Sequence, residues 1–335
     1  MAKKTDIKVV KDEVQQDDAL AQLKATAKQF SKYMNDQYRE AVSYTPDTSK
    51  IESVTVSKWV KMPGAFSEAI GLPGLPIGNI THVYGKPNVG KTTLLMEAIS
   101  NCQKQGILPI LILTEHKFDF TRLSKFMDAD PEAMIVLAAG SLEQAYSFME
   151  KILRDIRAGK IVIEDEDGKD LIINTEGQTF YMLMDSIGNT MSESELDYDV
   201  EDHGKSMGKG AKAIKTLTRR LNHLLGKTEV RSKCGILLLN QSYQSMPSYG
   251  PSIETPYGGD GIPFSCALSI RLRRKGDLKM SLKGKDTVIG LETIVEVKKN
   301  HIAHTMPIGT VYTVASGMLE STKEALDNYK KKFLK

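Results

Sequence analysis

The feature that most constrains this chain is a glycine-rich turn between two regular elements. Residues 85–92 read Gly-Lys-Pro-Asn-Val-Gly-Lys-Thr, which matches the pattern G-x-x-x-x-G-K-T. An apolar run at 80–84 precedes the turn and an amphipathic run at 92–104 follows it, so the context is strand, turn and helix. Glycine lets the backbone wrap closely, and amide N–H groups at a helix N-terminus can then face an anion. The sequence therefore predicts a site for the phosphates of a nucleotide.

Two side chains of the turn carry the expected chemistry. Lys91 would neutralise the terminal phosphates, and the hydroxyl of Thr92 would bind Mg²⁺. We therefore expect ATP and Mg²⁺ as cofactors. The alternative, an ordinary glycine turn with a surface lysine, is disfavoured by the flanking strand and helix. The expected nucleotide contacts are Gly85, Lys86, Pro87, Asn88, Val89, Gly90, Lys91, Thr92 and Thr93.

Composition excludes several classes of protein. The chain has 335 residues, 41% of them hydrophobic, which is enough for one large core or a core with a small appendage. No run of 18 apolar residues exists, so we expect no membrane span and no membrane partner. The first residues lack the apolar segment of a secretion signal. The three cysteines are scattered, which argues against a disulfide framework or a zinc site. We expect a cytoplasmic protein that is not secreted.

Charge is distributed unevenly along the chain. The net charge is only +3, but residues 271–335 carry 14 Lys and Arg against 7 Asp and Glu. A basic C-terminal part is compatible with a polyanionic partner, although a solvated surface is the commoner explanation.

The chain reads as three parts. Residues 17–41 have apolar side chains at helical spacing, and a Ser/Thr/Asp/Pro-rich connector at 43–49 and an extended piece at 51–56 follow. We expect 1–56 to be an N-terminal helix and linker that packs between subunits; the alternative is that it caps its own core. Residues 57–320 would form the core, and 321–335 a basic C-terminal tail.

Strands and helices alternate through the core. Apolar strands are expected at 80–84, 109–113, 134–138, 180–184, 235–240, 267–272, 293–297 and 311–315, and helices at 92–104, 120–127, 141–157 and 207–226. Ser141 and Gln144 form a capping-box pattern for the third helix. This order predicts an α/β fold, with a mainly parallel central sheet covered by helices on both faces. The later strands would extend the sheet antiparallel, and 160–174 would form an inserted hairpin.

Polar side chains follow three of the expected strands, where ligands of such sheets bind. Glu115 could accept a proton from the water that attacks the γ-phosphate, or it could cap the next helix. Asp185 is placed to hold Mg²⁺, with a helix cap again as the alternative. Gln241 offers a neutral amide that could sense the γ-phosphate.

Two long polar segments leave the strands that end near Asp185 and Gln241. They span about 190–210 and 242–261, and connections of this length are usually functional or disordered. The state of the γ-phosphate could bias their conformation.

Taken together, these motifs resemble the RecA/UvsX recombinase family, most closely its phage-encoded members. The resemblance covers roughly residues 17–320 and rests on the order of its motifs more than on any one of them. The motifs are Gly74-Leu75-Pro76-Ile77-Gly78, the turn at 85–93, Thr114-Glu115-His116, Asp185-Ser186, Asn240-Gln241, Gly258-Gly259 and Lys298-Lys299-Asn300-His301-Ile302-Ala303.

The resemblance implies a RecA-like P-loop ATPase core in a DNA-dependent ATPase. Such proteins form helical filaments on single-stranded DNA and promote strand exchange with double-stranded DNA, in recombination and repair. Glu115 resembles the water-activating glutamate of the family, and Gln241 the glutamine that couples the γ-phosphate to the second DNA loop. Lys299 resembles a cation that reaches the ATP of the neighbouring subunit. Single-strand-binding and mediator proteins are further implied partners, and the host cytoplasm the implied compartment of a phage protein.

The resemblance also assigns the DNA contacts. Segment 190–210 resembles the first DNA loop and segment 242–261 the second. The DNA-facing positions would be Met207, Lys212, Arg219, Gly258 and Gly259.

Three positions depart from the family pattern. Arg122 stands where an aromatic side chain usually stacks on adenine, although a guanidinium plane can also stack. His301 is the second cation of the trans pair, and a histidine is only partly charged at neutral pH, so weaker or pH-sensitive coupling between subunits is implied. Asp260 replaces an amide beside the glycines of the second loop, and its charge would repel phosphate.

Three hypotheses follow for the function. The first is a recombinase that assembles with ATP on single-stranded DNA. The second is a ring-forming motor ATPase with the same core, such as a helicase or a protein-handling ATPase. The third is a nucleotide-dependent DNA-binding scaffold without turnover. Filaments or rings in the microscope would separate the first two, and DNA-stimulated ATP turnover would test the third.

Overall fold

The structure, a computed structural model, describes residues 22, 24–30, 32, 36, 56, 58–115, 117–164, 170–188, 190–196, 209–245, 253–282 and 284–333. The chain divides into two units, Met1–Thr55 and Val56–Lys335. The described residues of the first unit, between 22 and 36, are helical. The rest of the helix expected at 17–41, the connector at 43–49 and the piece at 51–55 lie outside the described residues. The packing role of this segment stays a prediction.

One large sheet organises the described part of the second unit. Its strands follow the order β14-β13-β12-β11-β3-β9-β8-β4-β5, and β10 pairs with the end of β9. Neighbours from β11 to β5 run parallel, whereas β11 to β14 run antiparallel. The expected mainly parallel sheet with an antiparallel extension is therefore confirmed. The bounds are β3 Ile80–Gly85, β4 Ile107–Leu113, β5 Ile135–Ala138, β8 Thr179–Asp185, β9 Cys234–Ser245, β10 Ile253–Pro256, β11 Leu268–Leu282, β12 Lys285–Asn300, β13 Ile308–Val314 and β14 Gly317–Glu320.

The central strands are apolar on both faces because each face has its own core. Along β9, Leu237 and Leu239 belong to one core, whereas Ile236 and Leu238 belong to the other. The first core includes residues of helices α2 (Gly64–Ile70), α3 (Lys91–Lys104) and α4 (Phe120–Met127). The second includes residues of α5 (Leu142–Arg157), α8 (Lys209–Leu225), α9 (Thr228–Arg231) and α10 (Gly261–Ser265). Burial on both sides explains why these strands lack the alternation of a half-exposed strand.

The start of α5 has one of the two hydrogen bonds of the expected capping box. The Ser141 hydroxyl accepts a hydrogen bond from the backbone N–H of Gln144 at 3.0 Å. The Gln144 side chain accepts from the N–H of Gly140 at 2.7 Å, one residue before the position that a capping box would use. Asp119 caps α4 through the backbone N–H of Arg122 at 2.8 Å. Short-range chemistry therefore places the helix starts.

Several short elements were not expected from the sequence. Strands β1 (Trp59–Lys61) and β2 (Gly74–Pro76) pair antiparallel. The segment after β9 also differs from expectation, because β9 continues through Ser245 and pairs with β10 instead of becoming irregular at 242. The remaining short elements are a 3₁₀ turn at Pro131–Ala133 and helix α6 at Glu193–Leu196.

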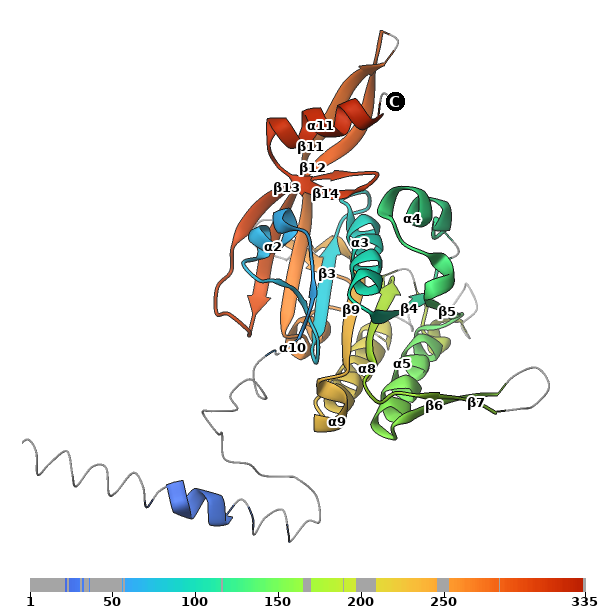
Figure 1. Ribbon diagram of the computed structural model, residues 1–335, viewed down its shortest axis with the longest axis vertical. Helices are drawn as coiled ribbons and strands as arrows, with labels where there is room; N and C mark the ends of the chain where they lie inside the picture. Colours follow the sequence, from blue (N-terminus) through green and yellow to red (C-terminus); the bar gives the residue numbers. More distant parts are fainter. Residues whose placement is uncertain are drawn as a thin grey trace, which may run out of the picture. The chain divides into compact units, whose positions relative to one another are not determined.

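Two features project from the sheet. The expected hairpin at 160–174 is present as β6 (Lys160–Glu164) paired antiparallel with β7 (Asp170–Asn174), and its predicted turn at 167–168 lies outside the described residues. The long β11–β12 hairpin extends beyond the other strands, and helix α11 (Lys323–Phe333) lies beside it (Figure 1). Tyr329 of α11 packs with Leu278 and Ile289 of that hairpin in a third core. The segment expected to be a basic tail at 321–335 therefore contains a packed helix, because its apolar residues recur at helical spacing.

Two expectations from composition can be compared with the described residues. All three cysteines are free and buried, and free cysteine behaves as a small apolar core residue. No helix in the described ranges combines the length and the hydropathy that a membrane crossing requires.

Candidate nucleotide-binding site

The glycine-rich turn joins the end of β3 to the start of α3. Gly85 lies so close to β11 that an added Cβ would be 2.4 Å from the carbonyl oxygen of Leu272. Gly90 has a φ of 99°, which favours glycine, and Asn88 has a φ of 58°. The backbone therefore requires glycine at both positions. The turn places the N-terminus of a long helix at the carboxyl edge of the sheet, where an anion would be stabilised.

Lys91 lies over this turn and among three carboxylates. Its Nζ donates hydrogen bonds to the carbonyl oxygens of Gly85 and Lys86, both at 2.8 Å. Burial lowers the pKa of Lys91, and the negative charges of Asp185, Glu115 and Glu254 act in the opposite direction. The ammonium group is thus held within reach of the turn that would carry the phosphates.

Thr92 and Asp185 meet at the end of β8. The Thr92 hydroxyl donates to a carboxylate oxygen of Asp185 at 3.2 Å. Burial, reinforced by the negative charge of Glu115, raises the pKa of Asp185 to about 6. Two oxygen donors at this distance fit Mg²⁺, which in nucleotide sites takes one or two protein ligands and completes its shell with phosphates and water. No larger cluster of His, Cys, Asp or Glu that could hold a metal occurs in the described ranges.

Glu115 belongs to the same group of side chains. The hydroxyl of Ser186 donates to Glu115 Oε1 at 2.9 Å. Thr114 is also tied to β8, because its hydroxyl donates to the carbonyl oxygen of Ser186 at 2.9 Å. These contacts bring the ends of β4 and β8 together beside the turn. The structure therefore groups Lys91, Thr92, Asp185 and Glu115 at the ends of neighbouring parallel strands, and their roles stay predictions.

Gln241 follows a buried polar cluster in the middle of β9. Asn240 accepts from the backbone N–H of Gln241 at 2.8 Å, and its Nδ2 lies 3.2 Å from His82 Nε2. Burial lowers the pKa of His82 to about 3, so the ring is neutral; its Nε2 accepts from Asn240 and its Nδ1 donates to Ser269 at 3.2 Å. Sequence reasoning missed His82, because it lies inside a segment that was interpreted only as a buried strand. The cluster fixes the backbone from which Gln241 projects.

Arg122 lines a cavity beside the turn. Its guanidinium donates to Thr93 Oγ1 at 2.8 Å and to the carbonyl oxygens of Val314 and Ala315, both at 3.1 Å. These bonds hold the guanidinium plane against the β13–β14 turn. Stacking of Arg122 on a base stays a prediction. The cavity measures about 290 Å³ and is lined by Asn88, Gly90, Lys91, Thr92, Thr93, Arg122, Ile289, Gly290, Leu291, Thr313, Val314 and Ala315.

Lys299 and His301 lie at and after the end of β12, and their hydrogen bonds do not go to the phosphate turn. Lys299 Nζ donates to the carbonyl oxygens of Pro263 at 2.7 Å and Phe264 at 3.1 Å. The side chain of His301 is exposed, and its backbone N–H bonds to Ala267. Their role toward a neighbouring subunit stays a prediction.

Helix α8 (Lys209–Leu225) lies beside the described ends of the two polar segments that were predicted to bind DNA. Lys212 and Arg219 are exposed and lie seven residues, or about two turns, apart on this helix. Gly258 has a φ of 82°, and a Cβ there would lie 2.9 Å from Ile214 of α8. Met207 lies outside the described residues, as do 197–208 and 246–252. The described ends of both segments therefore contact one helix.

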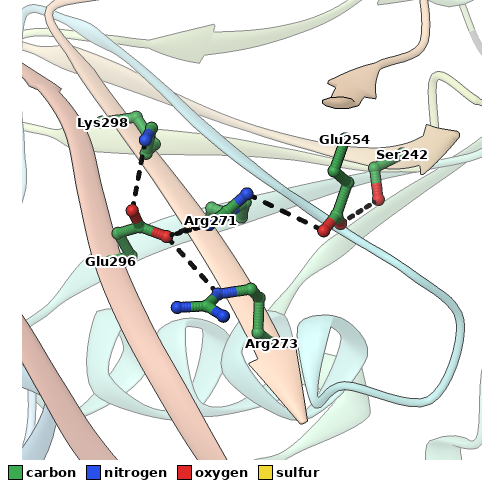
Figure 2. Close-up of polar contacts among 6 residues, drawn as sticks. All are labelled: Ser242, Glu254, Arg271, Arg273, Glu296 and Lys298. Carbon is green, nitrogen blue, oxygen red and sulfur yellow. Dashed lines mark hydrogen bonds and ion pairs between the residues drawn. The ribbon is translucent and has the colours of Figure 1, made fainter. Parts of the chain in front are cut away.

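Sequence reasoning also missed a cluster of charged side chains beside the candidate site. Arg271 on β11 contacts Glu254 on β10 and Glu296 on β12 (Figure 2). The alternation of Arg271 and Arg273 along β11, matched by Glu296 and Lys298 along β12, is the signal that could have revealed it. That signal becomes readable only when the pairing of β11 with β12 is known.

Comparison with known proteins shows which proteins this chain resembles. Residues 23–169 match the family model described as the RecA N-terminal domain. Protein RecA of Ruegeria pomeroyi is 27% identical over 235 residues, which is 70% of this chain and 58% of that protein. Protein RecA of Chlorobaculum tepidum is 28% identical over 263 residues, or 78% of this chain and 66% of that protein. The chain is thus similar to RecA proteins, at 27–29% identity.

A further RecA protein matches the chain to a similar extent. Protein RecA of Cytophaga hutchinsonii is 29% identical over 235 residues and 58% of its length. The match spans less than two thirds of the length of these curated proteins. The α/β sheet with its helices is consistent with a RecA-like core. A specific likeness to phage-encoded members stays a prediction.

Proposed function

We propose that this protein is a DNA-dependent ATPase of the recombinase class, which assembles on single-stranded DNA when ATP is bound. The observation that carries the proposal is the convergence of Lys91, Thr92, Asp185 and Glu115 at the carboxyl ends of β3, β4 and β8. These are the side-chain types that phosphoryl transfer needs in one place. The relationship to RecA supports the choice of DNA as the second ligand.

Each residue of the candidate site would have a distinct role in ATP hydrolysis. The amides of the turn and Lys91 would bind and orient the phosphates, and Lys91 would exchange its contacts with Gly85 and Lys86 for phosphate oxygens. Mg²⁺, when bound by Thr92 and Asp185, would supply positive charge to the terminal phosphates. Glu115, held by Ser186, would accept a proton from the attacking water. Gln241 would report the presence of the γ-phosphate to the second polar segment.

DNA binding would use the surface around α8. Lys212 and Arg219 are exposed there and can contact backbone phosphates, while Gly258 and Gly259 let amide groups approach closely. DNA affinity should therefore fall steeply with salt. Lys299 and His301 would act on the nucleotide of a neighbouring copy, so that ATP sits between subunits of a filament. Homologous pairing with double-stranded DNA, a phage origin, further protein partners and a cytoplasmic location belong to the same proposal.

The test compares the wild type with Lys91→Ala. We expect the wild type to hydrolyse ATP faster with single-stranded DNA and to form continuous helices in negative stain. Lys91→Ala should lose nucleotide binding, because the phosphates lose their main cation. Discrete rings would favour a motor ATPase, and assembly without turnover a scaffold. Assembly that is equal in the two proteins would contradict the proposal.

A further inference from the structure

A network of ion pairs joins three strands beside the candidate site. Arg271 Nε donates to Glu296 Oε2 at 2.8 Å, and a second guanidinium nitrogen of Arg271 lies 3.8 Å from Glu254. Glu296 also contacts Arg273 at 3.5 Å and Lys298 at 3.2 Å. Figure 2 shows Arg271 between the two carboxylates, with β10 on one side and β12 on the other.

The strand register explains why these side chains meet. Arg271 pairs with Tyr84 of β3 and with Glu296 of β12. Its neighbours Ile270 and Leu272 both belong to the first core, so Arg271 and Arg273 project from the opposite face of β11. Charged side chains on this face lie near the end of β3, where the phosphate turn begins.

The central residues of the network are shielded from water. The side chains of Arg271, Glu254 and Glu296 are 18%, 14% and 12% exposed. Burial alone would raise the pKa of Glu296, but its bonds to Arg271 and Lys298 outweigh this effect and lower it. A partly buried pair costs much when one partner is removed, since the other is left with unpaired charge. The contact is therefore specific rather than a loose surface pair.

Glu254, at one end of the network, lies close to the residues next to the candidate nucleotide site. Glu254 accepts a hydrogen bond from the hydroxyl of Ser242 at 2.6 Å, and Ser242 directly follows Gln241 in β9. The charge of Glu254 also acts on the pKa of Lys91. Glu254 on β10 is thus hydrogen-bonded to the residue that follows Gln241, and its charge acts on Lys91 of the turn.

The other end reaches the strand of the expected trans cations. Glu296 and Lys298 lie on β12, and Lys299 follows them and contacts α10. Arg271 is the residue that bridges the two ends, because it contacts both carboxylates. The two arms differ, with a close contact to Glu296 and a longer one to Glu254. The contact with Glu254 is therefore the weaker of the two.

We propose that Arg271 is a positioning residue, which ties the second polar segment through Glu254 to strand β12 and so couples DNA binding to ATP turnover. This inference rests on the proposed function. It assigns Arg271 no contact with substrate. Its effect is on the coupling between the two ligands, not on the binding of either one alone.

The test compares Arg271→Gln with Arg273→Gln in the full chain. Both changes remove one positive charge from the same strand and from contact with Glu296, but among the described residues only Arg271 also reaches Glu254. For Arg271→Gln we expect the stimulation of ATP turnover by single-stranded DNA to fall about tenfold, a typical size for coupling between sites. Turnover without DNA and binding of a fluorescent ATP analogue should change by less than about twofold. Arg273→Gln should retain the stimulation.

A double-mutant cycle with Glu254→Gln identifies the contact responsible. If Arg271 acts through Glu254, Glu254→Gln should lose stimulation as well, and the double variant should be no worse than either single variant. Additive losses, or normal stimulation in Arg271→Gln, would overturn the inference. Thermal unfolding checks that each variant is folded. If Arg271→Gln does not fold, Glu254→Gln tests the same contact from its other partner.

The response of wild-type ATP turnover to DNA distinguishes a failure of this inference from a failure of the proposed function. A wild type whose turnover does not respond to DNA contradicts the proposed function, and the inference fails with it. A wild type that responds normally, together with an Arg271→Gln variant that responds equally well, contradicts the inference alone.

Discussion

Burial changes the chemistry of individual carboxyl groups in this chain. Asp185 has a pKa raised to about 6 by burial and by the nearby charge of Glu115. Glu97 on α3 is 7% exposed, and burial raises its pKa from the ordinary 4.5 to about 7. Its two oxygens accept the backbone N–H of Met318 on β14 at 3.2 and 3.3 Å. Asp185 has a proposed role with Mg²⁺, whereas Glu97 joins the helix of the phosphate turn to the edge of the sheet.

Glu97 should make stability depend on pH. The folded protein binds this proton more tightly than the unfolded chain does, so ionisation of Glu97 should lower stability as pH rises from about 4.5 to about 7. Glu97→Gln keeps an acceptor for Met318 and removes this penalty. We expect the stability of the variant relative to the wild type to rise by at most about 3 kcal/mol across that range. Urea unfolding at a series of pH values measures it.

The control for this prediction is Glu132→Gln, because Glu132 is exposed. Its stability relative to the wild type should stay nearly constant with pH. A Glu97→Gln curve that also runs parallel to the wild type would show that Glu97 does not titrate in the folded protein over this range.

Glu115 is the residue on which turnover should depend. Glu115→Gln keeps the shape of the side chain and an acceptor for Ser186 but removes the base. We expect ATP hydrolysis to fall about 100-fold or more, while nucleotide-dependent DNA binding is retained. Single-turnover hydrolysis and fluorescence anisotropy with a labelled oligonucleotide measure the two properties. Unchanged hydrolysis would remove Glu115 from the proposed role.

At the scale of elements, α2 packs closely against β13. Gly309 lies on β13 against α2, and a Cβ there would be 2.5 Å from Cβ and 2.6 Å from Cα of Ala69. Because backbone atoms form part of this contact, the helix would have to shift as a unit. The sheet and this helix thus depend on a residue without a side chain.

Gly309→Ala should therefore destabilise the protein by about 1–3 kcal/mol, the usual cost of overpacking. Gly64→Ala on the other partner, helix α2, is the control, because nothing lies within 4 Å of its added Cβ. The control should be neutral or stabilising by up to about 1 kcal/mol, since alanine favours helix. Denaturant unfolding of both variants compares them. Equal stabilities would mean that α2 moves away from β13 at no cost.

The elements themselves were largely predictable because their signals are local. Helix α4 was expected at 120–127 and is observed as Phe120–Met127, since Asp119 caps its first turn. Strand β8 was expected at 180–184 and is one residue longer at each end. The short strands β1 and β2 were missed because three residues are too few to show a period. Likewise, the run of β9 through Ser245 depends on β10 for its pairing.

At the scale of the whole molecule, assembly would test the role of the β12 end. His301 and His304 are both exposed in the turn between β12 and β13. If His301 reaches the nucleotide of the next copy, a full positive charge there should strengthen ATP-dependent assembly at neutral pH. His301→Lys should then assemble at lower ATP concentration than the wild type, as measured by light scattering and negative stain.

The matched control is His304→Lys, which adds the same charge three residues farther along. Its ATP dependence should resemble that of the wild type. If His301→Lys and the wild type assemble at the same ATP concentration, His301 has no role in trans. If both variants shift equally, net charge rather than position explains the change.

Interactions between neighbours along the chain are encoded locally in this protein, and interactions across the sheet are not. The glycine turn, the strand–helix alternation and the polar residues at strand ends all follow from backbone preferences and spacings within a few residues. Arg271 and Glu296, by contrast, are 25 residues apart, and His82 and Asn240 are 158 apart. Those meetings depend on which strands pair and in what register, and a shift of one residue would send each side chain to the other face. Folding the whole chain therefore decides the ion network, the neutral histidine and the buried Glu97.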